Sequence, residues 1–232
     1  QTCALPIFQC AFDFGQINDA INFQKDVERC GFKTVKIMEG TRSFTSGDDD
    51  RVQTHHTFTC IYNGCFPAFL ISLGISYGKK TETIRNPIPE WIMNSVEYSR
   101  QFMKGFQGGD GCKIRYNYIN DKRNGATYYN FVIGETSQQI NPIYENSLIY
   151  FMKQCVEILN SFNIEVTNNI KIVNISDIRV KVSFNISSIM DNLINYFETI
   201  GYAYAETKNN QSFINIEYLK YKKLYLIDNN IT

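Results

Sequence analysis

The sequence lacks an excess of either charge. Its 232 residues include 23 Lys and Arg and 23 Asp and Glu, which gives a formal net charge of zero. Proteins that bind nucleic acid are usually basic, so a nucleic-acid function here would have to rest on local patches of Lys and Arg. Aromatic residues are plentiful, with 15 Tyr and 17 Phe. They supply enough apolar surface for one large domain or two small ones.

Signals for zinc binding and for membrane insertion are also absent. The two histidines are the neighbours His55 and His56, and no Cys-x-x-Cys pair occurs among the seven cysteines; Cys60 and Cys65 are the closest. This spacing does not match a zinc site, and we expect buried thiols in a reducing compartment. No apolar run reaches the roughly 18 residues of a membrane span, and no signal peptide is evident. We therefore expect no membrane association.

The first seven residues, Gln1–Ile7, resemble the translation of a common sequencing-adapter oligonucleotide. We treat them as an artefact and exclude them from the fold prediction. We then expect the native N-terminal part of the first domain to be missing.

Periodicity along the chain predicts an α+β protein. Alternating or aromatic-rich segments predict strands at 8–15, 33–38, 52–62, 112–119, 127–136, 170–175 and 178–186. Helical spacing predicts helices at 19–30, 66–73, 95–108, 144–162 and 188–200. We expect 213–221 to form a final strand or an extended tail. Residues 40–51 predict a polar turn with Asp48–Asp50 at its exposed tip, because runs of charge are usually solvated; a metal-binding loop is the alternative.

The two halves of the chain share one order of elements: strand, helix, two strands, helix and glycine. Phe69–Tyr77 and Tyr196–Tyr204 end the two halves in similar ways. A repeat of this length predicts a pseudo-twofold arrangement, with a first subdomain at 8–93 and a second at 94–232. The first half lacks the opening helix and first strand of the second half, as a truncation would leave it.

The stretch Ser95–Lys113 is the centre of the sequence. Small and apolar residues recur in it at helical spacing: Phe102, Gly105, Phe106 and Gly109. Gly105, Gly108 and Gly109 all stand in this stretch, and each glycine inside a helix costs about 1 kcal/mol relative to alanine. We therefore expect another backbone to approach this face of the helix closely.

The same stretch ends in Asp110-Gly111. We expect Gly111 to adopt the left-handed conformation common at a helix C-terminus. Asp110 does not suit that end, because the helix macrodipole places partial negative charge there, so its carboxylate needs a compensating cation. Mg²⁺, which prefers oxygen ligands, would serve. A flexible Asp-Gly turn is the alternative for this dipeptide.

Met103–Gly111 resembles the signature helix of LAGLIDADG homing endonucleases. Gly105 and Gly109 stand at the small positions of that family, Asp110 at its metal-binding acid and Gly111 at its closing glycine.

The flanking sequence is similar to the same family. Ile88–Ile92 and Tyr98–Phe102 look like the approach to the second signature helix in the endonuclease domains of inteins. The resemblance implies a pseudo-twofold monomer of two α-β-β-α-β-β-α units joined by their signature helices, with the first unit truncated at its N-terminus. It implies site-specific hydrolysis of double-stranded DNA with Mg²⁺ or Mn²⁺. It also implies a protein of the cytoplasm or nucleus, of the kind that viruses and mobile elements encode.

The resemblance assigns roles to individual residues. Asp110, with the backbone of Gly109, would bind the metal. The partner acid would lie in the missing first signature helix, so we expect this chain alone to cut DNA poorly or not at all. Lys80 and Lys208 would stabilise phosphate charge near the metal; solvated loop lysines are the alternative.

Duplex DNA would lie along strand faces, where basic side chains contact phosphates and base edges. Alternation along a strand places such side chains on one face. The expected DNA-contacting residues are Lys33, Lys36, Lys113, Arg115, Lys122, Arg123, Arg179 and Lys181.

A protein-splicing module is not visible in the sequence. The chain ends in Asn229–Thr232 without the terminal His-Asn of an intein, so we expect an insert from within an intein-bearing host protein, or a free-standing enzyme. Two alternatives stay open. One is an RNA-binding maturase, which uses the same fold to assist intron splicing. The other is a degenerate domain that binds DNA, or serves as an insert, without cutting.

Overall fold

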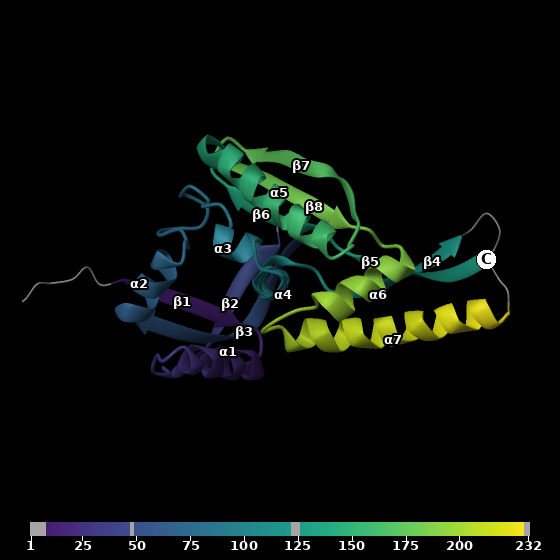
Figure 1. Ribbon diagram of the computed structural model, residues 1–232, viewed down its shortest axis with the longest axis horizontal. Coiled ribbons are helices and arrows are strands. Elements are labelled where there is room, and N and C mark those ends of the chain that lie inside the picture. Colours follow the sequence, from purple (N-terminus) through teal and green to yellow (C-terminus); the bar gives the residue numbers. More distant parts are fainter. Residues whose placement is uncertain (1–7, 47–48, 122–125, 230–232) are drawn as a thin grey trace, which may run out of the picture. The chain divides into compact units, whose positions relative to one another are not determined.

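The computed structural model describes residues 8–46, 49–121 and 126–229 (Figure 1). Helices combine with antiparallel sheets, so the chain is α+β as its sequence predicts. It divides into two compact units. The first runs to Ile75 and includes Tyr204–Glu206, and the second holds Ser76–Ala203 and the residues from Thr207 on. The predicted boundary between subdomains, at 93/94, falls inside the second unit.

The first unit packs two helices against a three-stranded antiparallel sheet. Its elements are β1 (Gln9–Phe14), α1 (Ile17–Arg29), β2 (Ile37–Ser46), β3 (Asp49–Asn63) and α2 (Cys65–Ser72), with the strands in the order β1-β3-β2. The core is aromatic. Phe12 packs on Phe23 with ring centroids 4.6 Å apart, and Tyr62 packs on Phe66 at 4.8 Å. These rings come from the inward face of the sheet and from one face of each helix, as the periodicities of two and 3.6 residues require.

Residues Tyr204–Glu206 complete the first unit. The ring of Tyr204 lies edge-on to Phe23, with centroids 5.5 Å apart, and its hydroxyl donates to Asp26 at 2.7 Å. The buried carboxylate of Asp19 accepts from the backbone N–H of Glu206 at 2.9 Å. It thereby satisfies one of the free N–H groups at the start of the C-terminal helix α7 (Glu206–Asp228).

Strand β2 begins later and continues further than predicted. Residues 33–36 precede it, so the strand prediction is wrong for them, and the polar turn predicted at 40–51 is wrong because β2 continues to Ser46. The polar side chains find cross-strand partners: Ser43 pairs with Thr54, and their hydroxyls lie 3.2 Å apart. The polar residues of this segment are therefore compatible with an exposed strand and do not indicate a turn. Asp48, at the predicted tip, lies outside the described residues.

The second unit contains two antiparallel sheets. Strands β4 (Ile114–Asp121) and β5 (Ala126–Ile133) form a two-stranded ribbon, and β6 (Thr136–Ile140), β7 (Val166–Ser176) and β8 (Arg179–Ile186) form a sheet in the order β6-β8-β7. Its helices are α3 (Glu90–Met93), α4 (Val96–Asp110), α5 (Glu145–Ser161), which follows a 3-10 turn at Pro142–Tyr144, and α6 (Met190–Thr199), together with most of α7. Helix α5 packs against β7 and β8 and buries Leu148, Cys155 and Val182.

The single strand predicted at 127–136 is wrong. Strand β5 ends at Ile133 and β6 begins at Thr136, and the two pair with different partners, β4 and β8. Gly134 stands at the break, where a Cβ atom would lie 2.8 Å from the Sγ of Cys112. The segment forms two strands because its two parts pair with different strands. The local sequence pattern does not show which strands these are.

The strand or tail predicted at 213–221 is also wrong, because α7 is a helix of 23 residues. Its docked face is narrow: Ser212, Ile216 and Leu219 are buried, at spacings of four and three. Large apolar residues also stand between them, so the sequence shows no clear amphipathic period. Among the helices in the described ranges, none has the length and apolar character needed to cross a membrane.

Candidate functional site at the end of helix α4

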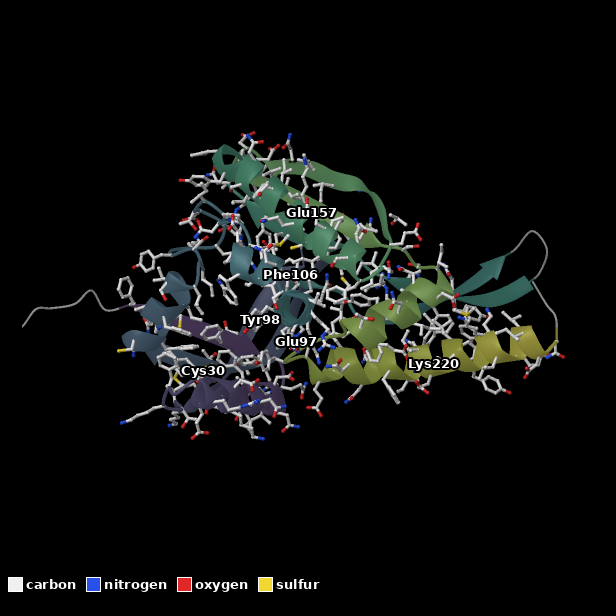
Figure 2. All side chains as sticks on the ribbon, viewed as in Figure 1. Cys30, Glu97, Tyr98, Phe106, Glu157 and Lys220 are labelled. Atoms are coloured by element: carbon white, nitrogen blue, oxygen red, sulfur yellow. The ribbon has the colours of Figure 1, made fainter. Side chains whose placement is uncertain are left out.

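Helix α4 carries the candidate site on its last residue, Asp110. The helix starts at a capping residue, Ser95, whose Oγ accepts from the backbone N–H of Tyr98 at 3.3 Å. Phe106 packs edge-on against Phe151 of α5, with ring centroids 5.6 Å apart (Figure 2). The cap sets where α4 begins and the aromatic contact sets its rotation, so together they orient its last turn.

A backbone approaches α4 closely at Gly108. A Cβ atom there would lie 1.9 Å from the carbonyl oxygen of Ala203, and the N–H of Ala203 donates to the Lys104 carbonyl at 2.9 Å. The predicted close approach is confirmed at Gly108, one of the three glycines for which it is predicted, and not at the other two. A Cβ atom at Gly105 or Gly109 would meet no other atom of the described chain within 4 Å.

Gly111 follows α4 in an extended conformation, with φ −80° and ψ 166°. The predicted left-handed conformation is therefore wrong. Glycine is needed for a different reason: a Cβ atom would lie 1.9 Å from Oε1 of Gln107 and 2.6 Å from its carbonyl oxygen. The chain leaves the helix past a buried glutamine, and only a residue without a side chain fits there.

The carboxylate of Asp110 has the compensating cation that its place on the helix requires. The ammonium of Lys80 donates to both Asp110 oxygens at 2.9 Å. The amide Nε2 of Gln138, on β6, donates to Oδ2 at 2.6 Å. The Asp110 side chain is 31% exposed and that of Lys80 is 51% exposed, so the pair remains open to a ligand from solvent.

Lys208 reaches the same turn of α4 but bonds to its backbone. Its Nζ lies 2.7 Å from the carbonyl oxygens of Gly108 and Gly111, 3.1 Å from that of Gly109 and 3.3 Å from that of Gln107. Carbonyls in the last turn of a helix commonly lack an intrahelical partner, and a cation is favourable there. The Gln107 carbonyl also accepts from the backbone N–H of Gly111 at 3.1 Å. Burial lowers the pKa of Lys208, while the nearby Cys112 and Asp110 act to raise it. The structure thus brings all three predicted catalytic residues together, with Lys208 as the cap of the helix.

Beneath Asp110 lies a buried polar layer that the sequence reasoning missed. Gln107 has no exposed surface, and its Oε1 accepts from the Thr136 hydroxyl at 3.2 Å. The Nε2 atom of Gln107 and the Oε1 atom of Gln138 are buried without a hydrogen-bond partner. A buried polar atom without a partner is costly, so both atoms suit a ligand or ordered water. The strand predicted at 127–136 ends before Gln138, so the prediction assigns Gln138 to no strand face.

Arg85 is a second residue that the sequence reasoning missed. Its guanidinium lies over the ring of Phe151, 5.2 Å from the centroid, and the Ser147 hydroxyl accepts from its backbone N–H at 3.0 Å. Its Nε is buried without a partner. Burial lowers the pKa of Arg85, and the charge of Asp110 acts to raise it. Arg85 precedes the Ile88–Ile92 flank, and that position was the one available signal.

The atoms around Asp110 fit a magnesium ion in ligand type. The Asp110 carboxylate, the partnerless Oε1 of Gln138 and the Gly109 carbonyl are all hard oxygen donors, which suit Mg²⁺ and Mn²⁺. In the described ranges no three His, Cys, Asp or Glu residues gather at one point, and Asp110 is the carboxylate that Lys80 and Gln138 hold here. Mg²⁺ is commonly held by one or two carboxylates with substrate phosphates and waters.

The predicted DNA-contacting residues lie in different settings. Arg179 and Lys181 share one face of β8, opposite the buried Val180 and Val182. Arg115 is exposed on β4, and Lys113, just before β4, donates to the Gln211 side chain. Lys33 and Lys36 are exposed but precede β2, so their predicted strand alternation is wrong. Lys122 and Arg123 lie outside the described residues.

Lys181 is already paired, because its Nζ donates to Glu135 at 2.7 Å. Burial acts to raise the pKa of Glu135, but hydrogen bonds from Lys181 and Ser183 and the charges of Lys181 and Lys171 outweigh it, so the pKa lies below its ordinary value. Cross-strand pairing places Gln139 opposite Lys181 and Ser137 opposite Ser183. Val173 of β7 also stands opposite Lys181, and Ser183 is buried, so this face of the sheet is only partly polar.

Comparison with known proteins gives partial and distant matches. No known protein-family profile matches the chain. It is 27% identical over 215 residues to the replication factor C small subunit of Methanocaldococcus jannaschii, which covers 90% of this chain and 10% of that protein. It is 26% identical over 217 residues to the tRNA-splicing ligase RtcB of the same organism, and this match covers 91% of this chain and 21% of the ligase. It is 25% identical over 229 residues to that organism's DNA-directed RNA polymerase subunit Rpo1N, covering 94% and 16%. The chain thus spans between about a tenth and a fifth of the length of these relatives.

Proposed function

We propose that the chain is a LAGLIDADG-type endonuclease domain that hydrolyses duplex DNA with Mg²⁺ or Mn²⁺, carried as an insert in a larger host protein. The observation that carries the proposal is the Asp110 carboxylate at the end of α4, held by Lys80 and Gln138. A helix C-terminus is an unfavourable place for a carboxylate. A function in cation and phosphate binding explains why this chain keeps one there.

Each residue around Asp110 has a different role in phosphodiester hydrolysis. A divalent ion, when bound, lowers the pKa of the attacking water and stabilises the leaving oxygen. Asp110 holds the ion, and Gln138 fixes the orientation of the carboxylate through its 2.6 Å hydrogen bond. Lys80 is half exposed, and its ammonium would transfer from the carboxylate to a phosphate oxygen when DNA binds. As a point charge it offsets the negative charge that develops on the phosphate.

The comparisons support the idea of an insert. Proteins with three unrelated names each match about nine-tenths of this chain, and each match is a minor part of the relative. A segment that recurs in proteins of different function, without the rest of those proteins, behaves as a module of its own. This is the distribution expected of an element that moves between genes.

The test uses the full-length protein that contains this chain. The substrate is a DNA duplex in which the two flanks of the insert's coding sequence are joined directly. We expect Mg²⁺-dependent cutting of this duplex. Asp110→Asn should lower the cleavage rate by more than the 10–100-fold typical of an outer-shell change at a metal site, that is by more than ~100-fold. Duplex binding without metal, measured by fluorescence anisotropy, should remain.

Asp228→Asn is the matched control, because Asp228 is also the last residue of a helix and is exposed. It should cut as well as the unchanged protein. If Asp110→Asn cuts equally well, Asp110 does not hold the metal and the proposal fails. If the unchanged protein binds the duplex but never cuts it, a degenerate binding domain replaces the nuclease. Preference for structured RNA over the duplex in a competition assay would point to the maturase.

A further inference from the structure

Helix α7 is apolar on two opposite faces. One face docks on the second unit through the buried residues Ser212, Ile216 and Leu219. Ser212 Oγ accepts from the N–H of Ile114 at 3.0 Å, and Asn215 donates to the Ile114 carbonyl at 2.9 Å. These contacts attach α7 to the start of β4. They explain why one face of the helix carries small and apolar residues.

The opposite face of α7 is exposed. Ile214 is 68% exposed, Tyr221 70%, Leu224 60% and Tyr225 53%. Figure 1 shows α6 and the β4–β5 ribbon along one side of α7 and no other described element of the second unit along its far side. A surface helix normally has one apolar face, which it buries against the core, and a further exposed apolar patch marks an interaction surface. The exposed face of α7 therefore indicates a surface that is covered when the protein functions.

The spacing of this face matches a helix–helix seam. Ile214, Tyr218, Tyr221 and Tyr225 follow one another at intervals of four, three and four residues. This is the repeat of the two core positions of a coiled coil. Tyr218 also stacks on Phe131 of the ribbon, with centroids 5.2 Å apart, so the seam rests on a rigid neighbour.

Charges on the two flanks of the seam are complementary to a second copy of the same helix. Glu217 stands on one flank and Lys222 on the other, five residues later. In a parallel pair of helices, these two flanking positions face each other across the seam. Glu217 of each copy then meets Lys222 of the other, twice by symmetry. Glu217 now bonds Lys220 at 2.9 Å, and Lys220 keeps a second partner in Glu198 at 2.7 Å (Figure 2).

The exposed apolar area also suits a dimer. Five large side chains on or beside the seam are between 49% and 70% exposed: Ile214, Tyr218, Tyr221, Leu224 and Tyr225. At roughly 200 Å² for each side chain, they present on the order of 600 Å² per chain, the lower end of the area that each partner buries in a specific interface. We propose that α7 is the surface through which two copies of this chain associate in parallel. The proposal does not depend on nuclease activity.

The first test measures oligomeric state without DNA. Sedimentation velocity over a dilution series should show a reversible dimer. Tyr221→Glu places a charge in the seam of both copies and should raise the dimer dissociation constant at least about 100-fold, as loss of a central aromatic contact does. Ile178→Glu is the control, because Ile178 is 66% exposed in the turn between β7 and β8; it should leave the dimer unchanged. Both substituted side chains are exposed, and far-UV circular dichroism checks that the fold is retained.

The second test exchanges the flanking charges. Glu217→Lys and Lys222→Glu each place like charges across both flanks and should each weaken the homodimer by about tenfold or more. A mixture of the two variants should form a heterodimer as tight as the original homodimer. A chain that stays monomeric up to about 0.1 mM, or a dimer insensitive to Tyr221→Glu and to the exchange, overturns the proposal. The monomer would match the pseudo-twofold expectation and would leave flanking host polypeptide to cover α7.

Discussion

Lys80 and Lys208 occupy matching places in the two halves of the chain and meet the same turn of α4, yet they bind different groups. Gly74, with φ +104°, lies six residues before Lys80, and Gly201, with φ +61°, lies seven residues before Lys208; a positive φ lets the chain turn sharply after a helix. Lys80 donates to the carboxylate of Asp110. Lys208 donates to backbone carbonyls around it.

The difference teaches that nearly equivalent positions in the two halves, one in a turn and one in α7, can supply either a ligand-binding cation or a structural one. Lys80 is half exposed and satisfied by one carboxylate, so it can exchange that partner for a phosphate at little cost. Lys208 is partly buried and shares its three N–H donors among the carbonyls at the end of α4. The comparison predicts that Lys208 contributes to stability and Lys80 to activity. Three substitutions test this prediction.

Gly108→Ala should have the largest effect on stability. Its Cβ would lie 1.9 Å from the Ala203 carbonyl oxygen, so the segment that leads to Lys208 must move away from α4. We expect the free energy of unfolding, from urea denaturation, to fall by about 3 kcal/mol or more. Gly105→Ala, in open space on the same helix, should instead raise it by about 1 kcal/mol. Equal effects of the two would show that no close approach occurs at Gly108.

Lys208→Met should have the second-largest effect on stability. It keeps the apolar stem but removes the ammonium from four carbonyl oxygens, and we expect unfolding free energy to fall by about 2 kcal/mol, the range for hydrogen bonds to a charged group. Lys153→Met, at an exposed position on α5, should change it by less than about 0.5 kcal/mol. If Lys208→Met is as mild as this control, Lys208 does not cap α4 and stands free for another role.

Lys80→Met should have the smallest effect on stability and a clear one on cutting. A half-exposed ion pair contributes less than about 1 kcal/mol, so urea denaturation should barely change. DNA cleavage by the full-length protein should slow by about 100-fold, as for other groups that stabilise transition-state charge. Lys79→Met removes the neighbouring lysine, which pairs with Glu82, and should cut normally. A large loss of stability without loss of cutting would reverse the assignments of Lys80 and Lys208.

The sequence pattern predicts most helices and the long strands of this fold. Two of the wrong predictions, for β6 and α7, have one cause. The helix at 95–108 and the helix at 144–162 have strong apolar stripes and occur as predicted. Strand β6 and helix α7 were misread because pairing and docking partners decide their state. β6 is recognisable only beside β8, and α7 only by its contact with β4.

The candidate site shows the same division. Asp110 stood out because a carboxylate at a helix C-terminus is a local signal, and Lys80 was predicted only from the family resemblance. Gln138 and Arg85 had no local signal, since they lie 28 and 25 residues from Asp110 along the chain. The reason for glycine at 111 was also hidden, because it depends on where the buried side chain of Gln107 points.

The sequence by itself determined the α+β class, the position of α4 and the presence of a carboxylate that needs a cation. These follow from periodicity, glycine placement and the helix dipole, which act over a few residues. Only the tertiary structure decided which cation meets Asp110, which glycine admits a second backbone and which lysine becomes a cap. Those outcomes depend on distances of a few ångströms between segments far apart in the chain, and local patterns do not encode them.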